Sequence, residues 1–207
     1  MSDEVTLFEH LSGLLEEGHK RAVTGLMSDE RFADTERSTP AAVLIAVVDR
    51  PEPTLILTQR PQDMRDHPGQ VAFPGGKLDP GEDAVTAALR EAEEEIALPP
   101  ASVQVIGTTD RYQTGTGFDV TPVLGVVHPQ DTRNLQANPA EVEAWFEAPL
   151  ELLLNRANFT ENEVFWRGAM RTYLDMDYQG FRIWGVTAAI IANFSLRIDA
   201  DALFNRD

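Results

Sequence analysis

The stretch of sequence that decides the fold begins as Gly75-Gly76-Lys77-Leu78-Asp79-Pro80-Gly81-Glu82 and continues, seven residues later, as Arg90-Glu91-Ala92-Glu93-Glu94-Glu95. Residues 83–96 are rich in Ala, Leu and Glu, contain no Gly or Pro, and are followed by Pro99-Pro100, so we predict a helix there. At about 100° per residue, Glu91, Glu94 and Glu95 lie on one face of this helix. The opposite side carries an apolar stripe, formed by Val85, Leu89, Ala92 and Ile96.

Three neighbouring carboxylates carry an electrostatic cost, because like charges one turn apart on a helix repel each other by roughly 0.2–0.5 kcal/mol per exposed pair. They also lie near the C-terminal end of the helix, where the helix dipole disfavours anions. A divalent cation removes both costs, and clustered carboxylate oxygens suit hard ions such as Mg²⁺ or Mn²⁺. An acidic triplet taken by itself is more often a solvated surface, but the sequence around this one favours a metal site.

The spacing of the charged residues resembles a known motif. The pattern Gly76-x5-Glu82-x7-Arg90-Glu91-Ala92-x-Glu94-Glu95-x-Ala97-Leu98 is similar to the Nudix box, G-x5-E-x7-R-E-U-x-E-E-x-G-U, in which U is a bulky apolar residue. Every charged position matches, whereas Ala97 replaces the closing Gly and Ala92 is small for its position. The resemblance implies the Nudix fold, an α/β/α sandwich with a mixed sheet, and metal-dependent hydrolysis of a phosphoanhydride bond.

The same resemblance assigns roles to the acidic residues. Glu91, Glu94 and Glu95 would bind Mg²⁺ or Mn²⁺, with two or more ions per site, and Glu82 would support them directly or through water. Glu94 would therefore be essential for catalysis. Arg90 would orient the carboxylates by bidentate pairing.

A narrower resemblance lies just before the box. The stretch Ile56-Leu57-Thr58-Gln59-Arg60-Pro61-x3-Arg65-x3-Gly69-x3-Phe73-Pro74-Gly75-Gly76 is similar to the signature of the coenzyme A pyrophosphatase branch, L-L-T-x-R-[SA]-x3-R-x3-G-x3-F-P-G-G, with Pro61 as the main departure. It implies that CoA or acyl-CoA is split into 3′,5′-ADP and 4′-phosphopantetheine or its acyl form. The alternatives are a Nudix hydrolase for ADP-ribose or NADH, and a catalytically silent binding module on the same fold.

The branch signature also suggests residues that bind the substrate. Arg60 and Arg65 would contact its phosphates, and Gly75 and Gly76 would let it approach the backbone. His67 lies between Arg65 and Gly69, where it is either solvated or in contact with substrate.

Two segments after the box complete the predicted site. The loop at residues 110–117 is either a long hairpin turn or a substrate-facing loop, in which Tyr112 would stack on the adenine. Further on, Asn138-Pro139-x-Glu141-Val142 resembles the CoA branch, and Nudix enzymes often carry a carboxylate near this point that acts as a base or a further metal ligand. Glu141 is the first candidate for that role and Glu143 is the alternative.

The composition limits the class of protein. The 207 residues suit one domain, so we expect a single Nudix-type domain over 1–207. With 17 Lys+Arg and 34 Asp+Glu, the net charge of −17 opposes binding to nucleic acid or an anionic membrane. The sequence has no cysteine, no apolar run near the roughly 18 residues of a membrane span and no signal-peptide pattern, so we expect a cytoplasmic protein. The expected partners are a nucleotide substrate and, given the apolar terminal helices, a second copy in a homodimer.

The rest of the chain predicts an alternating order of strands and helices. We expect helices at residues 5–21, 149–155 and 186–196, and strands at 41–48, 54–59, 103–109, 118–127, 141–147, 171–177 and 181–184. This order predicts a mixed sheet that is covered by helices on both faces, again an α/β/α sandwich.

Overall fold

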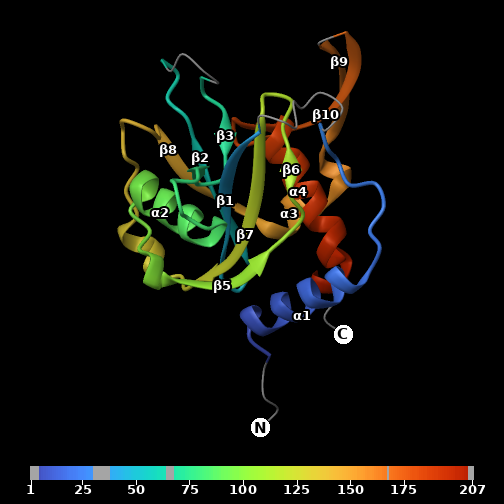
Figure 1. Cartoon of the computed structure of the whole chain (residues 1–207). Coiled ribbons are helices and arrows are strands. Elements are labelled where there is room, and N and C mark those ends of the chain that lie inside the picture. The colour runs from blue at the N-terminus through green and yellow to red at the C-terminus, as the bar shows by residue number, and fades with distance from the viewer. Residues whose placement is uncertain (1–4, 30–37, 64–67, 167, 205–207) are drawn as a thin grey trace.

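The computed structural model of the chain describes residues 5–29, 38–63, 68–166 and 168–204 (Figure 1). Within these residues, no helix is both long and apolar enough to cross a membrane. The helices and strands follow one another as α1 (Leu7–Lys20), β1 (Thr39–Val48), β2 (Thr54–Gln59), β3 (Val71–Ala72), β4 (Gly75–Lys77), α2 (Ala84–Ile96), β5 (Val103–Thr108), β6 (Tyr112–Gln113), β7 (Phe118–Val127), β8 (Ala144–Pro149), α3 (Leu150–Leu154), β9 (Thr160–Trp166), β10 (Ala169–Tyr178), β11 (Phe181–Trp184), α4 (Gly185–Ile198) and α5 (Ala200–Phe204).

The main sheet is mixed, with the strand order β3-β2-β1-β7-β5. Its two longest strands, β1 and β7, run parallel, from the pair Thr39 and Phe118 to the pair Val48 and Val127. The other pairings are antiparallel: β2 joins β1, β3 and β8, β5 joins β7, and the short strands β4 and β6 add to β1 and β7. A separate antiparallel sheet consists of β11, β10 and β9.

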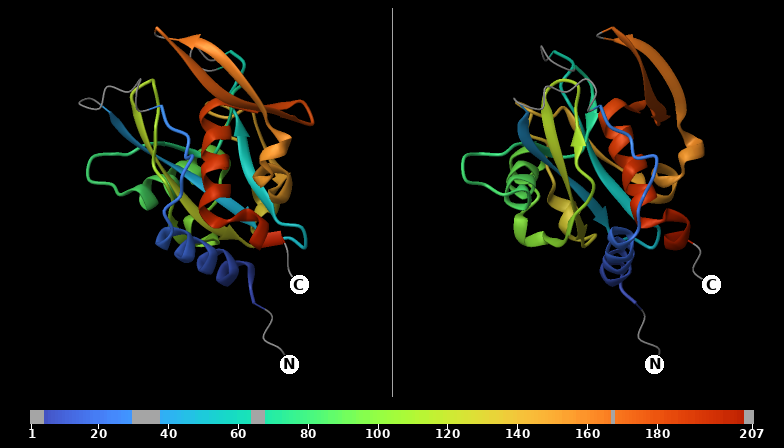
Figure 2. Two further views of the ribbon diagram at one scale, coloured as in Figure 1. Left: turned by 90° about the vertical axis from the view of Figure 1, so that its right-hand side faces the viewer. Right: turned by 45° about the vertical axis from the view of Figure 1, so that its right-hand side comes forward.

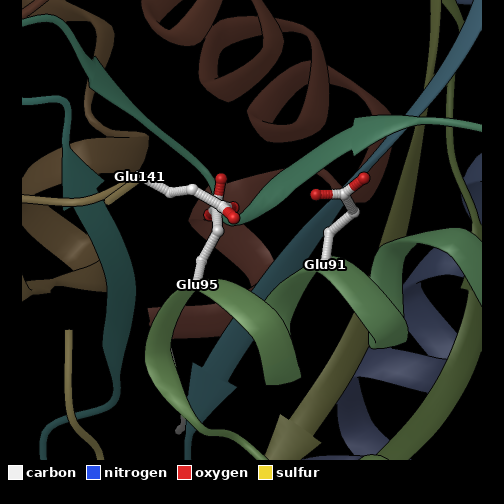
Figure 3. Close-up of side chains that lie close together, drawn as sticks. All are labelled: Glu91, Glu95 and Glu141. Atoms are coloured by element: carbon white, nitrogen blue, oxygen red, sulfur yellow. The ribbon is translucent and has the colours of Figure 1, made fainter. Parts of the chain in front are cut away.

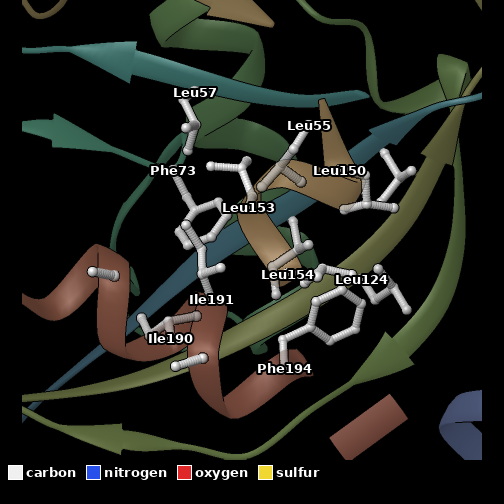
Figure 4. Packing of buried hydrophobic residues seen from close by; sticks show 14 of the residues in the cluster. Leu55, Leu57, Phe73, Leu124, Leu150, Leu153, Leu154, Ile190, Ile191 and Phe194 are labelled. Carbon is white, nitrogen blue, oxygen red and sulfur yellow. The ribbon is translucent and has the colours of Figure 1, made fainter. Parts of the chain in front are cut away.

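The sheet lies between two layers of helices, because its central strand sends alternate side chains into two cores. From β1, Ile45 and Val47 enter the core that α1 and α4 cover, whereas Leu44 and Ala46 enter the core that α2 covers. Figures 1 and 2 show α2 on one side of the sheet and α1 and α4 on the other. Figure 4 shows how α4 packs through Ile190 and its neighbours against the sheet. The predicted α/β/α sandwich with a mixed sheet is confirmed.

Most predicted elements lie within a few residues of their observed bounds, and the exceptions have physical reasons. The predicted strand at 141–147 begins only at Ala144, after a turn. Gly75–Lys77 was not among the predicted strands, but it forms β4, which pairs with β1. Strand β9 was not predicted, because its pattern of apolar residues is absent: five of its seven residues are exposed to solvent.

A buried arginine joins α1, α4 and the loop after β5. Arg197 is only 8% exposed, and its guanidinium donates to both carboxylate oxygens of Asp110, at 2.7 and 2.5 Å. Its third nitrogen donates to the carbonyl oxygens of Gly18, at 2.7 Å, and Arg21, at 3.2 Å. Gly18 is required there, because a Cβ would lie 2.1 Å from the carbonyl oxygen of Arg197. The start of the loop at 110–117 is therefore fixed to the helical layer.

Ala97, which stands where the Nudix box has Gly, ends α2 in the left-handed conformation, with φ 57° and ψ 33°. Its N–H donates to the carbonyl of Glu93, at 3.0 Å, and the N–H of Leu98 donates to that of Ala92, at 3.3 Å. The backbone therefore makes the turn that Gly would make, and the Cβ of Ala97 costs roughly 1 kcal/mol in this conformation.

We expect Ala97→Gly to raise the free energy of unfolding by about 0.5–1 kcal/mol, because it removes this clash at a position where φ is positive. Urea denaturation of the two proteins measures the difference. Ala101→Gly, at an exposed position outside the left-handed region, is the control and should not stabilise the protein. Equal or lower stability of Ala97→Gly would contradict the assignment of strain to Ala97.

Candidate active site

An N-terminal cap and a buried apolar face together fix the orientation of helix α2. Asp83 caps the helix, and its Oδ1 accepts a hydrogen bond from the N–H of Thr86 at 2.8 Å. Of the predicted apolar stripe, Val85 and Leu89 are half-buried and lie at the edge of the contact with the sheet. The fully buried apolar positions of the helix are Ala87, Ala88, Ala92 and Ile96. Small alanines let α2 lie close to β1.

Three carboxylates meet above this helix. Glu91, Glu95 and Glu141 each offer an oxygen, and these oxygens all lie within 4.8 Å of one another. Figure 3 shows Glu91 and Glu95 rising from α2 and Glu141 reaching in from the segment before β8. We call these three residues the carboxylate triad. It contains two of the three predicted helix acids and the residue predicted as a base or further ligand.

Glu94 and Glu82 lie beside the triad and contact Arg90. The side chain of Glu94 is 49% exposed, and its Oε2 accepts from Nη1 of Arg90 at 2.9 Å. Positions 91 and 95 differ by about 40° around the helix, whereas position 94 is about 60° away on the other side of Glu91. Glu94 therefore points toward Arg90, four residues before it. Among the described residues, the triad is the group placed to hold a metal, and the predicted metal roles of Glu94 and Glu82 stay predictions.

Arg90 fixes the loop before α2 and the strand above it. Its guanidinium binds Glu82 through two hydrogen bonds, at 2.9 and 3.0 Å, and donates to Oε1 of Glu91 at 3.0 Å. It also donates to the carbonyl oxygen of Lys77 at 3.1 Å. The hydrogen bonds that Arg90 donates to Glu82 raise the pKa of Arg90, so it stays charged. The bidentate geometry expected of Arg90 is present, with Glu82 as its main partner.

The two glycines of β4 let the carboxylates reach the edge of the sheet. A Cβ on Gly76 would lie 2.3 Å from Oε1 of Glu91, so only Gly leaves room for that carboxylate. The N–H of Gly75 donates to Oε2 of Glu95 at 3.4 Å. A Cβ on Gly75 would itself lie 2.4 Å from the carbonyl oxygen of Ala42. Both glycines are therefore dictated by close contacts, and Gly76 is in direct contact with the triad.

The donor set of the triad fits a hard divalent ion. Glu95 is only 8% exposed, and burial, opposed by the N–H of Gly75 and reinforced by Glu91 and Glu141, raises its pKa to about 8. Burial also raises the pKa of Glu91 in spite of its contact with Arg90. Glu91 and Glu95 are therefore costly to ionise unless a cation is bound. Together with Glu141 they form an all-oxygen site of the kind that Mg²⁺ and Mn²⁺ prefer.

This electrostatic arrangement predicts that metal binding depends on pH. Folding raises the pKa of Glu95 from 4.5 to about 8. Without metal, the proton on Glu95 therefore stabilises the folded state over the unfolded state fully below pH 4.5, and this stabilisation is lost as the pH rises through 8. A divalent ion must displace the proton, so its affinity should increase between pH 6 and pH 8. We expect Mg²⁺ to raise the melting temperature more at pH 8 than at pH 6. An equal increase at both values would contradict the role of Glu95.

A pocket of about 530 Å³ lies on the other side of Gly75 and Gly76. It is bounded by β1, β4, β7 and the first two turns of α4, so we call it the α4 pocket. Arg60 and Lys77 line it. Arg60 is close enough to Glu95 to offset a small part of the rise in the pKa of that carboxyl that burial causes. Its other lining residues are uncharged. Because Gly75 and Gly76 touch the triad and also line the pocket, a ligand could extend from one to the other across these residues.

Other residues named from the sequence lie away from the triad or outside the described residues. Arg65 and His67 lie outside the described residues. Glu143, the alternative base, instead accepts a hydrogen bond from the N–H of Gln62 at 3.2 Å. It therefore helps to hold the loop that follows Arg60.

The structure does not support the predicted stacking of Tyr112 on a substrate base. Tyr112 is 2% exposed and its ring belongs to the core on the α4 side of the sheet. Burial and the neighbouring Asp29 raise the pKa of its hydroxyl, and Asp29 is itself paired with Arg171. The short strand β6 turns the ring inward, so it has no open face for a base.

Phe118 and the first turn of α4 were not predicted from the sequence to be part of the site. Phe118 lines the α4 pocket, and Nζ of Lys77 lies 5.7 Å from the centre of its ring. Val186 and Ile190 form the opposite wall. No local signal marks these residues, because they come together only through the parallel pairing of β1 with β7 and the packing of α4.

Comparisons with known proteins agree with this geometry. The sequence model described as the NUDIX domain matches residues 38–166. The protein called uncharacterized Nudix hydrolase NudL, from Escherichia coli strain K12, is 44% identical over 167 residues, which cover 80% of this chain and 85% of NudL. NudL of Shigella boydii serotype 4 shows the same identity and coverage. Among solved structures, the Nudix hydrolase RenU from M. smegmatis has a TM-score of 0.52 at 20% identity, covering 81% of this chain and 88% of RenU, and shows the shared fold.

The match to the family covers more than half of the chain and includes the box, α2 and the triad. Nudix hydrolases use divalent metal ions, and the oxygen ligands of the triad suit such ions. The sequence motif, the fold and the relatives lead to one conclusion: this chain belongs to the Nudix family and is a pyrophosphohydrolase that acts on a nucleoside diphosphate derivative.

Proposed function

We propose that this Nudix hydrolase cleaves the diphosphate bond of CoA or acyl-CoA, so that water adds across the bond and releases 3′,5′-ADP and 4′-phosphopantetheine or its acyl form. The observation that supports this substrate is the position of the second sequence signature. Four of its residues, Arg60, Phe73, Gly75 and Gly76, line the α4 pocket beside the carboxylate triad. Part of a signature that resembles the CoA branch thus lines the pocket into which a substrate of this site would extend.

The triad is the proposed metal site. Glu91, Glu95 and Glu141 would hold Mg²⁺ or Mn²⁺, with two or more ions when Glu82 and Glu94 also take part. Bound ions of this kind polarise phosphoryl oxygens and lower the pKa of a coordinated water. Arg90 holds Glu91, a member of the triad, and Glu94 beside it through hydrogen bonds of 3.0 and 2.9 Å. Metal affinity therefore depends on Arg90 as well as on the ligands.

The remaining roles concern the substrate. The backbone of Gly75 and Gly76, which carries no side chain, would let the diphosphate lie close to the triad. Arg60 would pair with its phosphate oxygens, and Arg65 and His67 stay predicted contacts. Glu141 would accept the proton from the attacking water, since its oxygen lies within 4.8 Å of those of Glu91 and Glu95. A homodimer and a cytoplasmic location also stay predictions from the sequence.

A substrate panel tests the proposal. CoA, acetyl-CoA, ADP-ribose and NADH would each be incubated with the purified full-length chain and Mg²⁺ or Mn²⁺, and the products would be identified by mass spectrometry. We expect kcat/KM to be highest for CoA or acetyl-CoA, with 3′,5′-ADP among the products. Higher kcat/KM for ADP-ribose or NADH would contradict the CoA assignment. No cleavage of any compound would favour a binding module.

A further inference from the structure

We propose that the α4 pocket binds the acyl-pantetheine arm of the substrate and that Val186 sets the preferred length of the acyl chain. The inference rests on the proposed function and adds which half of the substrate this pocket takes. Three features of the pocket carry it: which side chains face into it, where its charges lie, and which polar atoms remain available.

The pairing of the strands makes the floor of the pocket apolar. Paired residues of adjacent strands point to the same face of a sheet. Ala41 pairs with Lys77 on one side and with Val120 on the other, so all three face α4. The small side chain of Ala41 leaves the space that Lys77 crosses to reach Phe118. The floor between the cation and α4 therefore consists of small and aromatic apolar groups.

The two charged residues that line the pocket come from the loop after β2 and from β4, and neither lies on α4. Arg60 acts on the Glu95 carboxylate, and Lys77 directly follows Gly76 in β4 and is exposed. None of the described residues that line the pocket is acidic, although the chain has twice as many acidic as basic residues. Arg60 and Lys77 thus offer positive charge to the diphosphate, whereas the residues of α4 that line the pocket offer no cation for the further phosphate on the adenosine half of CoA. That half is better placed outside the pocket.

The inner wall also has few polar groups for a nucleobase. Its only hydroxyl on α4 belongs to Thr187, which is buried and donates to the carbonyl oxygen of Val71 at 2.9 Å. Val186 and Ile190 complete this side of the wall. Gln70 and Thr116, the other uncharged polar residues of the lining, do not belong to α4. Adenine buried against the α4 wall would therefore find no free side-chain partner on it, at a cost of about 1–3 kcal/mol for each unpaired group. A flexible, apolar acyl chain carries no such cost.

Val186 is the residue of the α4 wall whose size can be changed with least effect on the core. It lies in the first turn of α4, immediately after Gly185, which has a positive φ of 61° and starts the helix. Val186 is half-buried, whereas Ile190, one turn later, is 3% exposed and belongs to the core. A change in side-chain volume at Val186 should therefore alter the pocket and disturb the core less than a change at Ile190.

The test is the dependence of kcat/KM on acyl-chain length, measured with Mg²⁺ for free CoA and for saturated acyl-CoAs. In the unchanged protein, we expect kcat/KM to rise by up to about fourfold per added methylene until the chain fills the pocket. Val186→Phe should move the optimum to shorter chains and Val186→Ala to longer ones. Val164→Phe is the matched control, because Val164 is 42% exposed on β9 and does not line the pocket. It should leave the optimum in place.

Thermal unfolding shows whether each variant is folded. If Val186→Phe does not fold, the shift expected for Val186→Ala still tests the inference. If the unchanged protein cleaves CoA but its kcat/KM does not vary with acyl-chain length, the inference is overturned and the proposed function is kept. An unchanged optimum in both Val186 variants, together with weaker inhibition by 3′,5′-ADP, would place the adenosine half in the pocket and also overturn it. Cleavage of ADP-ribose but of no CoA compound would overturn the proposed function and the inference together.

Discussion

Replacing Glu95 by Gln should lower kcat/KM by about a thousandfold and should leave the fold intact. Gln has the same shape, so the packing around this position of α2 is kept, but it cannot supply an anionic oxygen to the metal. A metal contributes several kcal/mol to a transition state of this kind, and about 4 kcal/mol corresponds to a thousandfold in rate. The metal-free variant should also be more stable at pH 8, because burial of the ionised Glu95 is unfavourable.

The measurement combines steady-state kinetics with calorimetric titration of Mn²⁺. Glu93→Gln is the matched control: it makes the same chemical change on the same helix, at an exposed position outside the triad. We expect it to keep nearly full activity and metal affinity. Unchanged metal affinity in Glu95→Gln, or equal losses in both variants, would contradict the role assigned to the triad. Glu94→Gln in the same series would show whether Glu94 is a metal ligand, as predicted, or only a partner of Arg90.

Gly76→Ala should have an effect almost as large, because the new Cβ would lie 2.3 Å from Oε1 and 2.4 Å from the carboxyl carbon of Glu91. Something must shift, and the end of a flexible side chain shifts more easily than the strand. We therefore expect the carboxylate of Glu91 to leave the triad, with a loss of at least about a hundredfold in kcat/KM and weaker metal binding. The cost in folding stability should be much smaller than the loss of activity.

Two further Gly→Ala variants separate the site from the fold. At Gly13, in α1, a Cβ meets nothing within 4 Å, so Gly13→Ala should keep full activity and stabilise the helix by about 0.5–1 kcal/mol. At Gly75 the Cβ would meet the backbone of β1, so Gly75→Ala should reduce the yield of folded protein. Full activity in Gly76→Ala would mean that Glu91 does not need its observed position.

The local elements were predictable because each has a clear pattern of its own. Helix α2 was expected at 83–96 and spans Ala84–Ile96, with Asp83 as its cap. The continuous apolar run at residues 41–48, which forms most of β1, is typical of a strand that is buried on both faces. The structure brings five of the predicted site residues together, with Glu91 and Glu95 from α2, Gly75 and Gly76 from β4, and Glu141 from the segment before β8.

The features that were missed depend on contacts between distant parts of the chain. The inward orientation of Tyr112 follows from the pairing of β6 with Val120 and from Asp29, which lies 83 positions earlier in the sequence. Likewise, the α4 pocket needs Phe118 and Val186 to lie on opposite sides of one space. Position 94 shares a helix face with 91 and 95, but its direction was decided by Arg90, a detail that periodicity alone does not contain.

The most direct test of the account is a crystal structure of the protein grown with Mn²⁺, in which anomalous scattering locates the metal independently of any assumed ligand. The account predicts an anomalous peak that is bound by the carboxylates of Glu91, Glu95 and Glu141, and the loss of this peak in Glu95→Gln. A Mn²⁺ peak bound elsewhere, with these three carboxylates free of metal, would contradict it.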